Sequence, residues 1–374
     1  MTIMNVKDLL KPFKLKTLKL PGRVVMAPMT RNRSPQHIPG PEVAKYYRRR
    51  AENHVGLIIT EGTVVDVTGH AYPDVPNFFG EKALKGWKRV VKDVHSAGGK
   101  IFPQLWHAGS VRQRGMAPYR KRPSYGPSSI PHPAIEDGEP PVEMSVDDID
   151  GIILAFAKAA KQAKNIGFDG IEINGAHGYL VDQFFWDRTN KRTDRFGGET
   201  LAERTYFASE LIRAVRDKVG KEFPICLRIS QWKMGGVDSR LANTPQELAA
   251  FLAPLLDAGV DIFHCSSLRF FEPEFPGSDL NLAGWTKKIT RKPVITVGSV
   301  GLDTDFVSMR IKGETAKSSE KTIYDVLDRL SRDEFDLVAI GRALLADPTW
   351  VTKIVDGHFD KIKTFTMECL ETLY

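Results

Sequence analysis

Eight short apolar segments recur along this chain, and they constrain its fold more than any other feature. Each is nearly continuous in valine, isoleucine, leucine or phenylalanine and does not alternate with polar residues. Strands have this composition when both of their faces are buried, as in parallel sheets covered by helices. The segments are RVVMAP (23–28), VGLIIT (55–60), KIFPQL (100–105), GIEIN (170–174), PICLRIS (224–230), DIFHCS (261–266), PVITVG (293–298) and DLVAIG (336–341).

Amphipathic helical patterns lie between most of these segments. Helix starts with an N-cap hydroxyl and a capping-box acid are expected at Thr244–Glu247 and at Ser145–Asp148. The first start also has Pro245 in its first turn, where proline is favoured. Helices are further expected over residues 84–97 and 201–219. Buried strands that alternate with helices are typical of an α/β fold with a parallel sheet.

Eight β/α repeats within 374 residues predict a TIM barrel, (β/α)8, as a single domain over residues 1–374. A doubly wound sheet is the alternative, but no GxGxxG turn follows any early strand. The connection between residues 106 and 147 is long and rich in proline, glycine and serine. We expect a functional loop or lid there, or small elements of its own.

Composition excludes several classes of function. The chain carries 53 Lys and Arg against 46 Asp and Glu, and the excess is spread along it. We interpret the basic stretches 46–50 and 120–122 mainly as solvated surface, and secondarily as attraction for a phosphorylated ligand. No nucleic-acid motif is present. The cysteines Cys226, Cys265 and Cys369 lie far apart, so we expect neither a metal site nor a disulfide framework.

Targeting signals are not evident. Charges interrupt residues 1–16 too early for a signal peptide, and no apolar run approaches the length of a membrane span. We therefore expect a cytoplasmic protein without a membrane or nucleic-acid partner, as free thiols also suggest. The sequence is compatible with a monomer or a homo-oligomer. Residues 363–374 are expected to close the barrel rim or to reach a neighbouring subunit.

Polar side chains gather where the predicted strands end. In a (β/α)8 barrel these ends open on one face, where active sites are built. The fourth strand runs into Asn174, His177 and Tyr179, which are separated by small residues. The third strand carries Gln104 and is followed by Trp106. We expect these side chains to surround one site.

Arg228 lies inside the apolar fifth strand, where a guanidinium needs an anionic or strongly accepting partner. A carboxylate such as Glu61 or Glu172 is one candidate. A ligand that becomes negatively charged, as a reduced flavin does at its pyrimidine side, is the other. Gln104 offers the donor and acceptor that the imide edge of a flavin requires, and Thr30 suits the opposite edge.

The ends of the last two strands predict a phosphate site. Gly298 and Ser299 follow the seventh strand, and Gly341 and Arg342 follow the eighth. Glycines let backbone N–H groups approach a phosphate, and barrels often bind phosphate at this place. An arginine adds positive charge. A pair of glycine-rich turns without a ligand is the alternative interpretation.

Through a set of motifs, the chain resembles the Old Yellow Enzyme family of FMN-dependent ene-reductases over nearly its whole length. The motifs are RVVMAPMTRNRS, GLIITEGT, FPQLWHAG, GPSSIP, EMSVDDI, FDGIEINGAHGYLVDQFFWDRTNKRTDRFGG, ITVGSVG and LVAIGRALLADP. The resemblance implies a (β/α)8 barrel with non-covalent FMN. It places around the isoalloxazine Ala27, Pro28, Met29, Thr30, Gly62, Gln104 and Arg228, and at the phosphate Gly298, Ser299, Gly341 and Arg342.

The resemblance also implies the chemistry. NADPH or NADH reduces the FMN, and a hydride then passes to the β-carbon of an α,β-unsaturated carbonyl compound. Asn174 and His177 would donate hydrogen bonds to the carbonyl oxygen, and Tyr179 would supply the proton. Trp106 would shape the substrate pocket. Many relatives have histidine at the first donor position, whereas this chain has asparagine first and histidine second, which leaves its choice of enone open.

Three other functions are weighed against this one. Flavin dehydrogenases, demethylases and dienoyl-thioester reductases of the same barrel group usually carry an iron–sulfur cluster, and this chain has no cysteine cluster. A flavin-free aldolase or isomerase barrel would need a catalytic lysine or paired carboxylates, and Glu61 is the one obvious carboxylate at a strand end. In a non-catalytic flavoprotein, the replacement of Tyr179 by phenylalanine would leave the behaviour of the protein unchanged.

Two further segments have expected roles. Residues 268–276, with three phenylalanines, are expected to line or cover the pocket or to form an interface. Residues 192–198, RTDRFGG, are expected to be structural, with charges that pair with each other.

Overall fold

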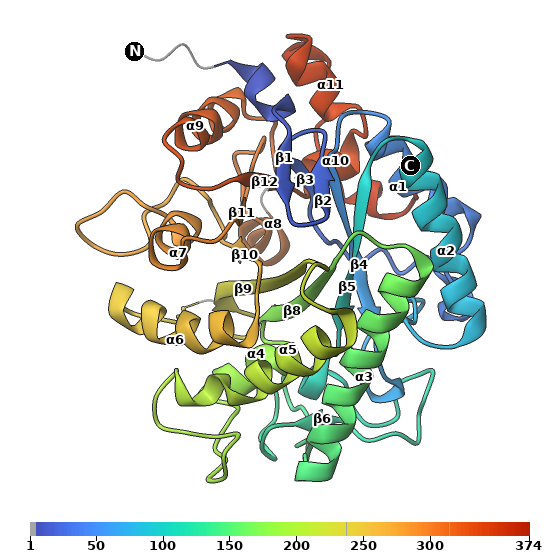
Figure 1. The fold of residues 1–374 in the computed structure, drawn as a ribbon, viewed down its shortest axis with the longest axis vertical. Coiled ribbons are helices and arrows are strands. Elements are labelled where there is room, and N and C mark those ends of the chain that lie inside the picture. The colour runs from blue at the N-terminus through green and yellow to red at the C-terminus, as the bar shows by residue number, and fades with distance from the viewer. Residues whose placement is uncertain (1–4, 237, 314) are drawn as a thin grey trace.

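The core of the computed structural model, which describes residues 5–236, 238–313 and 315–374, is a closed barrel of parallel strands (Figure 1). The last strand pairs with the first, with Ile340 beside Met26. The predicted TIM barrel is therefore confirmed. Its strands are β3 (Val24–Met26), β4 (Leu57–Val64), β5 (Lys100–Trp106), β8 (Ile171–His177), β9 (Ile225–Lys233), β10 (Ile262–Ser266), β11 (Val294–Val297) and β12 (Leu337–Ile340).

Three strands run three or four residues further than predicted, and β5 runs one residue further. β4 continues to Val64, β8 to His177 and β9 to Lys233, so polar residues that were expected in loops belong to strand ends. The pairing register shifts between Ile59 and Gly62 and between Gly175 and His177. Such bulges re-aim side chains near active sites, and glycine and polar residues in them resemble a loop in the sequence.

The inside of the barrel changes from apolar to polar along its axis. At the amino-terminal end, Phe13 and Leu20 of the hairpin β1 (Phe13–Leu15) and β2 (Leu18–Leu20) pack into one buried cluster with Phe102, Cys226 and Ile262. Side chains alternate along a strand, so the next inward positions are two residues on. Those positions hold the buried polar residues Gln104, Arg228 and His264.

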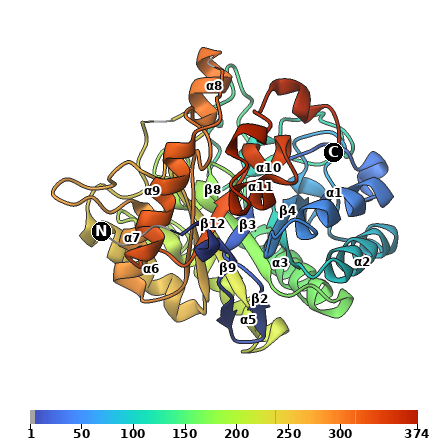
Figure 2. The ribbon, with the colours of Figure 1, turned by 90° about the horizontal axis from the view of Figure 1, so that it is seen from above.

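Helices surround this barrel (Figures 1 and 2). Helix α5 begins at Tyr206, later than predicted, because residues 203–205 form a separate 3-10 turn. The helices are α1 (Pro41–Ala51), α2 (Glu81–Ser96), α3 (Val146–Ile166), α4 (Leu180–Phe185), α5 (Tyr206–Val219), α6 (Pro245–Ala258), α7 (Leu282–Thr290), α8 (Phe306–Lys312), α9 (Glu320–Ser331), α10 (Arg342–Ala346) and α11 (Trp350–Val355).

The two predicted helix starts differ in detail. Ser145 and Asp148 form both halves of a capping box at α3, as predicted. Thr244 caps α6 by accepting the N–H of Glu247, so the predicted N-cap is confirmed. The Glu247 carboxylate, however, accepts the N–H of Asn243 at 2.7 Å. The carboxylate therefore caps the residue before the N-cap, and the prediction of a reciprocal capping box at this helix is wrong.

The long connection between β5 and α3 carries small elements. It contains a 3-10 turn (Gly109–Val111) and the short parallel strands β6 (Tyr125–Gly126) and β7 (Val142–Glu143). Its His132 is buried, and Nε2 lies 2.8 Å from the carbonyl oxygen of Gly178. The loop is thereby tied to the end of β8, where the candidate catalytic residues lie.

Part of the basic stretch 46–50 is not solvated surface, which corrects our first interpretation. Arg50 is fully buried and donates to the carbonyl oxygens of Leu344 and Tyr374. Arg49 donates to the carbonyl of Leu373 at 2.9 Å. Backbone carbonyls of the C-terminal segment, near α1 in both views, satisfy these cations (Figures 1 and 2).

The C-terminal segment also contacts the loop after β3. Nη2 of Arg31 donates to the carbonyls of Cys369, Leu370 and Thr372. Phe365 is buried in a cluster against which Met29 packs. The segment thus lies on the rim of its own barrel, one of the two expected arrangements. In the described ranges, no helix combines the length and the apolar character needed to cross a bilayer.

Candidate active site

The three candidate catalytic residues lie along the end of β8 and the turn that leads into α4. His177 and Gly178 have φ angles of 63° and 81°, the left-handed region that glycine tolerates best. The N–H of Gly178 donates to Asp182 at 2.7 Å, and its carbonyl accepts from Gln183 at 2.7 Å. Both side chains are fully buried, so the turn that carries His177 and Tyr179 is held from both sides.

A chain of hydrogen bonds fixes the orientation of Gln104. Its Nε2 donates to Glu172 at 2.7 Å, and its Oε1 accepts from Nδ2 of Asn174 at 3.2 Å. The other oxygen of Glu172 lies 2.7 Å from Nδ1 of His264. A carboxylate only accepts hydrogen bonds, so the amide nitrogen of Gln104 must face Glu172. Burial opposes the negative charge of Glu172, but His264, Arg228 and Gln104 outweigh it and keep its pKa below the usual value.

His177 is held as a neutral ring. Its Nε2 lies 2.8 Å from Oγ of Ser266, and its face stacks on Trp232 with ring centroids 4.4 Å apart. Burial, and then the nearby charge of Arg228, hold the pKa of His177 well below its usual value. A neutral imidazole has one N–H, so His177 can donate from only one nitrogen at a time.

Arg228 is a buried cation with an unmet donor. Nη2 donates to Ser266 at 3.3 Å, whereas Nε is buried and has no hydrogen-bond partner in the described part of the chain. Neither predicted carboxylate forms an ion pair with it among the described residues. Glu172 binds His264 and Gln104, and Glu61 accepts the N–H of Arg31. A ligand with negative charge would satisfy this guanidinium, which is what the pyrimidine side of reduced FMN offers.

An aromatic wall flanks Tyr179. Its ring meets the ring of Trp106 edge to face, with centroids 5.1 Å apart, and Tyr72 stacks on Trp106 at 5.9 Å. The hydroxyl oxygens of Tyr72 and Tyr179 are 3.2 Å apart. Tyr179 is the N-cap residue of α4 and is partly exposed. Its hydroxyl therefore has a hydrogen-bonding neighbour, and the residue remains partly open to solvent.

The predicted phosphate residues converge from the neighbouring strands β11 and β12. Nη2 of Arg342 donates to the carbonyl of Thr304 at 2.6 Å, and Oγ of Ser299 lies 3.4 Å from the same carbonyl and donates to that of Leu268 at 2.9 Å. Burial lowers the pKa of Arg342 to about 10, so it stays charged at neutral pH. Gly298 has a φ of 146°, and a Cβ there would approach the carbonyl oxygen of Ser267 to 2.6 Å. Only glycine fits this turn.

The other predicted cofactor residues lie beside these groups. A Cβ at Gly62 would lie 3.2 Å from the ring of Trp106 and 3.4 Å from Oε1 of Gln104. A Cβ at Gly341 would lie 3.4 Å from Sδ of Met29. Around the end of β3, Ala27 is buried, Pro28 and Met29 are partly exposed, and Thr30 is exposed. The structure brings all the predicted residues to the carboxyl end of the barrel.

Sequence reasoning missed Tyr72 and Trp232 as contacts of the candidate catalytic residues. Trp232 was overlooked because strand β9 was expected to end at residue 230, two residues earlier. Ser266 was predicted only as the last residue of the strand at 261–266. Tyr72 follows β4 in an irregular loop, where the sequence has no periodic pattern to point to it.

Glu61 is buried at the edge of the site, and burial raises its pKa to about 7 despite backbone N–H groups of Arg31 and Asn32. An acid whose pKa rises on folding stabilises the fold at low pH and loses this contribution as the pH passes its folded pKa. The unfolding free energy should therefore fall between pH 4.5 and about 7 by roughly 3 kcal/mol relative to Glu61→Gln.

Chemical denaturation of both proteins at pH 4.5 and pH 8 measures this difference. Glu42→Gln, at an exposed glutamate, is the control and should show no comparable pH dependence. A Glu61→Gln variant that tracks the wild type at both pH values would contradict the assignment.

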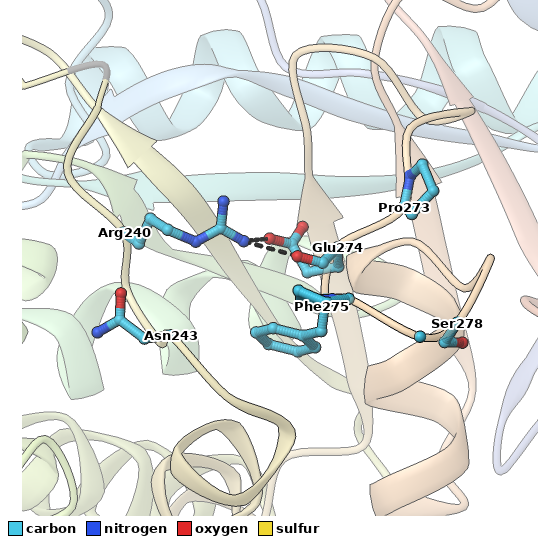
Figure 3. A pocket seen from close by; sticks show the side chains of 8 residues that line it. Arg240, Asn243, Pro273, Glu274, Phe275 and Ser278 are labelled. Atoms are coloured by element: carbon cyan, nitrogen blue, oxygen red, sulfur yellow. Dashed lines mark hydrogen bonds and ion pairs between the residues drawn. The ribbon is translucent and has the colours of Figure 1, made fainter.

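A cavity of about 600 Å³ lies between the loops after β9 and β10 (Figure 3). Arg240 pairs with Glu274 across it, and Gln231 donates to the same carboxylate at 2.8 Å. The segment 268–276 contributes Pro273 and Phe275 to its wall. The lining residues of this cavity do not include the candidate catalytic residues, so the segment borders a neighbouring hollow.

Segment 192–198 has the expected internal pairing. Arg192 forms a bidentate pair with Asp194 and donates to the carbonyl of Met144 at 2.7 Å. Phe196 is buried. These contacts join the segment after α4 to the start of α3.

Comparison with known proteins decides the family. Residues 8–317 match the model of the NADH:flavin oxidoreductase / NADH oxidase family. The chain belongs to this family. It is 34% identical to 12-oxophytodienoate reductase 2 of Arabidopsis thaliana over 350 residues, which cover 91% of this chain and 86% of the relative.

Solved structures of this family superpose on the barrel. Morphinone reductase in complex with tetrahydroNAD is 27% identical, with a TM-score of 0.79 over 97% of this chain and 93% of that chain. Old Yellow Enzyme from Pichia sp. AKU4542, at 24% identity, shares the fold with a TM-score of 0.80 over 97% of this chain and 90% of that one. The resemblance to the Old Yellow Enzyme family is thereby confirmed.

The family settles the cofactor chemistry. The chain is an FMN-dependent ene-reductase of the NADH:flavin oxidoreductase family, with NADH or NADPH as the reductant. The residues fit FMN, because Nε of the buried Arg228 has no hydrogen-bond partner among the described residues, and the turn of Gly298 and Ser299 lies beside Arg342. A flavin-free aldolase or isomerase barrel does not agree with this membership.

Proposed function

We propose that this enzyme reduces the C=C bond of α,β-unsaturated carbonyl compounds, with Asn174, His177 and Tyr179 as its catalytic residues. The observation that carries the proposal is their position. Two neutral donors and a phenol lie within six residues at the end of β8, and Asn174 is paired in the sheet with the buried Arg228, whose Nε has no partner among the described residues. Bound FMN supplies the hydride for the β-carbon, and NADPH or NADH replenishes it.

The donors stabilise the charge that develops on the substrate carbonyl. Asn174 uses one N–H for Gln104 and keeps a second for a ligand. His177 contributes the N–H of its neutral ring. Donors that are already oriented stabilise an oxyanion better than water does, because they need not reorganise. The contacts of Asn174 with Gln104 and of His177 with Ser266 and Trp232 provide this orientation.

Tyr179 completes the reaction by giving its hydroxyl proton to the α-carbon. A phenol is a stronger acid than water, so it gives its proton to the electron-rich α-carbon more readily than water would. The 3.2 Å contact with the hydroxyl of Tyr72 and the edge-to-face contact with the ring of Trp106 hold the Tyr179 hydroxyl oxygen in position. Trp106 and Tyr72 also supply apolar surface for the substrate.

The cycle is tested by an anaerobic visible spectrum of the purified protein. NADPH, then NADH in a second sample, should bleach the flavin band, and 2-cyclohexenone should restore it. A protein that is colourless and does not take up FMN contradicts the flavin site. Bleaching without recovery on addition of the enone contradicts the roles of Asn174, His177 and Tyr179.

Arg228→Met should weaken FMN binding by about 10- to 100-fold, because one hydrogen bond to a charged group contributes about 1.5–3 kcal/mol. Titration of FMN into the apoprotein, followed by flavin fluorescence, measures the Kd. Arg228→Lys keeps the charge but loses the planar fork, so its Kd should be intermediate. An unchanged Kd in Arg228→Met would show that this guanidinium does not contact the flavin.

A further inference from the structure

The hydroxyl of Ser266 lies between two residues of the active site. Its Oγ is 2.8 Å from Nε2 of His177 and 3.3 Å from Nη2 of Arg228. Ser266 is the last residue of β10 and is 4% exposed. Its hydrogen bonds are therefore made within the protein, and their directions follow from the chemistry of its partners.

Arg228 determines one of these directions. A guanidinium donates and never accepts, so Oγ of Ser266 accepts from Arg228. The serine keeps its own O–H to donate. Among the described residues, Nε2 of His177 is the acceptor within hydrogen-bonding distance of that hydroxyl. If Nε2 carried a proton instead, the buried O–H would lack a partner, which is costly.

The tautomer of His177 follows from this arrangement. An Nε2 that accepts from Ser266 carries no proton, so the one N–H of the neutral ring is at Nδ1. We propose that Ser266 holds His177 as the Nδ1–H tautomer and thereby makes Nδ1 the nitrogen that donates to the substrate carbonyl. No hydrogen bond of Nδ1 occurs within the described chain, so this N–H is available to a ligand.

The surroundings of the ring support a single tautomer. Stacking on Trp232 holds the plane of the imidazole, and the His177 backbone N–H donates to Oγ of Ser230 at 2.9 Å. A half-turn of the ring about its Cβ–Cγ bond would place a carbon where Nε2 lies, so it would lose the Ser266 hydrogen bond. Ser266 is thus a positioning residue that acts through His177, and its part in catalysis rests on the proposed function.

Nitrogen NMR of the FMN-loaded protein labelled with ¹⁵N-histidine tests this directly. The His177 signal, assigned by its loss in His177→Asn, should show a protonated Nδ1 and an unprotonated Nε2. Ser266→Ala should shift the ring towards a mixture of tautomers. Ser266→Thr, which keeps the hydroxyl, should retain the wild-type spectrum. A protonated Nε2 in the wild type, or an unchanged spectrum in Ser266→Ala, overturns the proposal.

Ser230→Ala is the matched control. Oγ of Ser230 accepts the backbone N–H of His177 and donates to the carbonyl of Trp232. It makes no hydrogen bond with the ring nitrogens of His177 in the described chain. Its loss should leave the protonated nitrogen at Nδ1. A shift of the tautomer in Ser230→Ala as large as that in Ser266→Ala would overturn the specific role of Ser266.

Kinetics connect the tautomer to the reaction. In Ser266→Ala, kcat/KM for 2-cyclohexenone should fall by about 2- to 10-fold, the range of one neutral hydrogen bond, and Ser266→Thr should recover it. The nitrogen NMR spectrum, in contrast, does not depend on turnover. If the wild type has the Nδ1–H tautomer but does not reduce enones, the proposed function fails while the tautomer assignment stands.

Discussion

Tyr179→Phe should lower the rate of enone reduction by about 10²- to 10⁴-fold, the contribution of a positioned general acid. The substitution removes one oxygen and keeps the ring that packs against Trp106. Reduction of the flavin by NADPH needs no proton from this residue, so it should be nearly unchanged. Stopped-flow absorbance, in which the two half-reactions are recorded separately, distinguishes the lost acid from a misfolded site.

Tyr72→Phe is the matched control for this experiment. It removes the hydroxyl that lies 3.2 Å from that of Tyr179 but leaves the proposed acid in place. We expect a loss within about tenfold, since one neutral hydrogen bond contributes about 0.5–1.5 kcal/mol. If Tyr72→Phe is the slower variant, the proton comes from Tyr72. Re-oxidation at the wild-type rate in Tyr179→Phe would exclude Tyr179 as the donor.

Asp182→Asn should destabilise the protein by about 3–5 kcal/mol, because it leaves the ammonium of Lys233 buried without a counter-charge. Asp182 and Lys233 form an ion pair in which both side chains are almost fully buried. Asparagine has nearly the same shape and keeps an oxygen for the N–H of Gly178. The loss of unfolding free energy would therefore come from the missing charge and not from a cavity. Equilibrium denaturation in urea measures the free energy of unfolding.

Two further variants test the explanation. Replacing both partners, as Asp182→Leu with Lys233→Met, should recover most of the stability, because neither charge is then buried alone. Glu42→Gln breaks the exposed pair with Lys45 and should change the unfolding free energy by less than about 1 kcal/mol. An Asp182→Asn variant as stable as Glu42→Gln would mean that Lys233 finds another partner or loses its proton.

The ion pair of Asp182 and Lys233 contacts the residues of the turn that carries His177 and Tyr179, so it links stability to activity. Asp182 holds the N–H of Gly178, and Lys233 is paired with His177 in the β8–β9 ladder. A variant that loosens this pair should affect His177 and Tyr179 together. In the double variant, stability should be recovered but activity should not, because leucine cannot accept the N–H of Gly178.

Much of the fold could be predicted because its signals are local. A strand buried on both faces must be apolar at nearly every position, so each barrel strand is visible in a window of a few residues. The capping box of Ser145 and Asp148 is equally local, because its partners are three residues apart. The candidate site followed from the same strands, since a parallel barrel opens all its strand ends on one face.

Strand limits were less accurate for a physical reason. Near the carboxyl ends of β4, β8 and β9 the inward face is polar and the pairing register shifts at glycines. A strand there no longer has an apolar pattern, although its backbone still pairs. Trp232 was missed on this account, and Glu61 was placed at a strand end although β4 continues past it.

By itself, the sequence determined the barrel, its strand order and the residue types at its mouth, because these depend on burial and local periodicity. Only the tertiary structure decided which buried polar groups meet. Ser266 reaches His177 from 89 residues away, and His264 reaches Glu172 from 92. Such pairs depend on the register between strands. A buried donor must find an acceptor, but no local pattern says which one the closed barrel brings beside it.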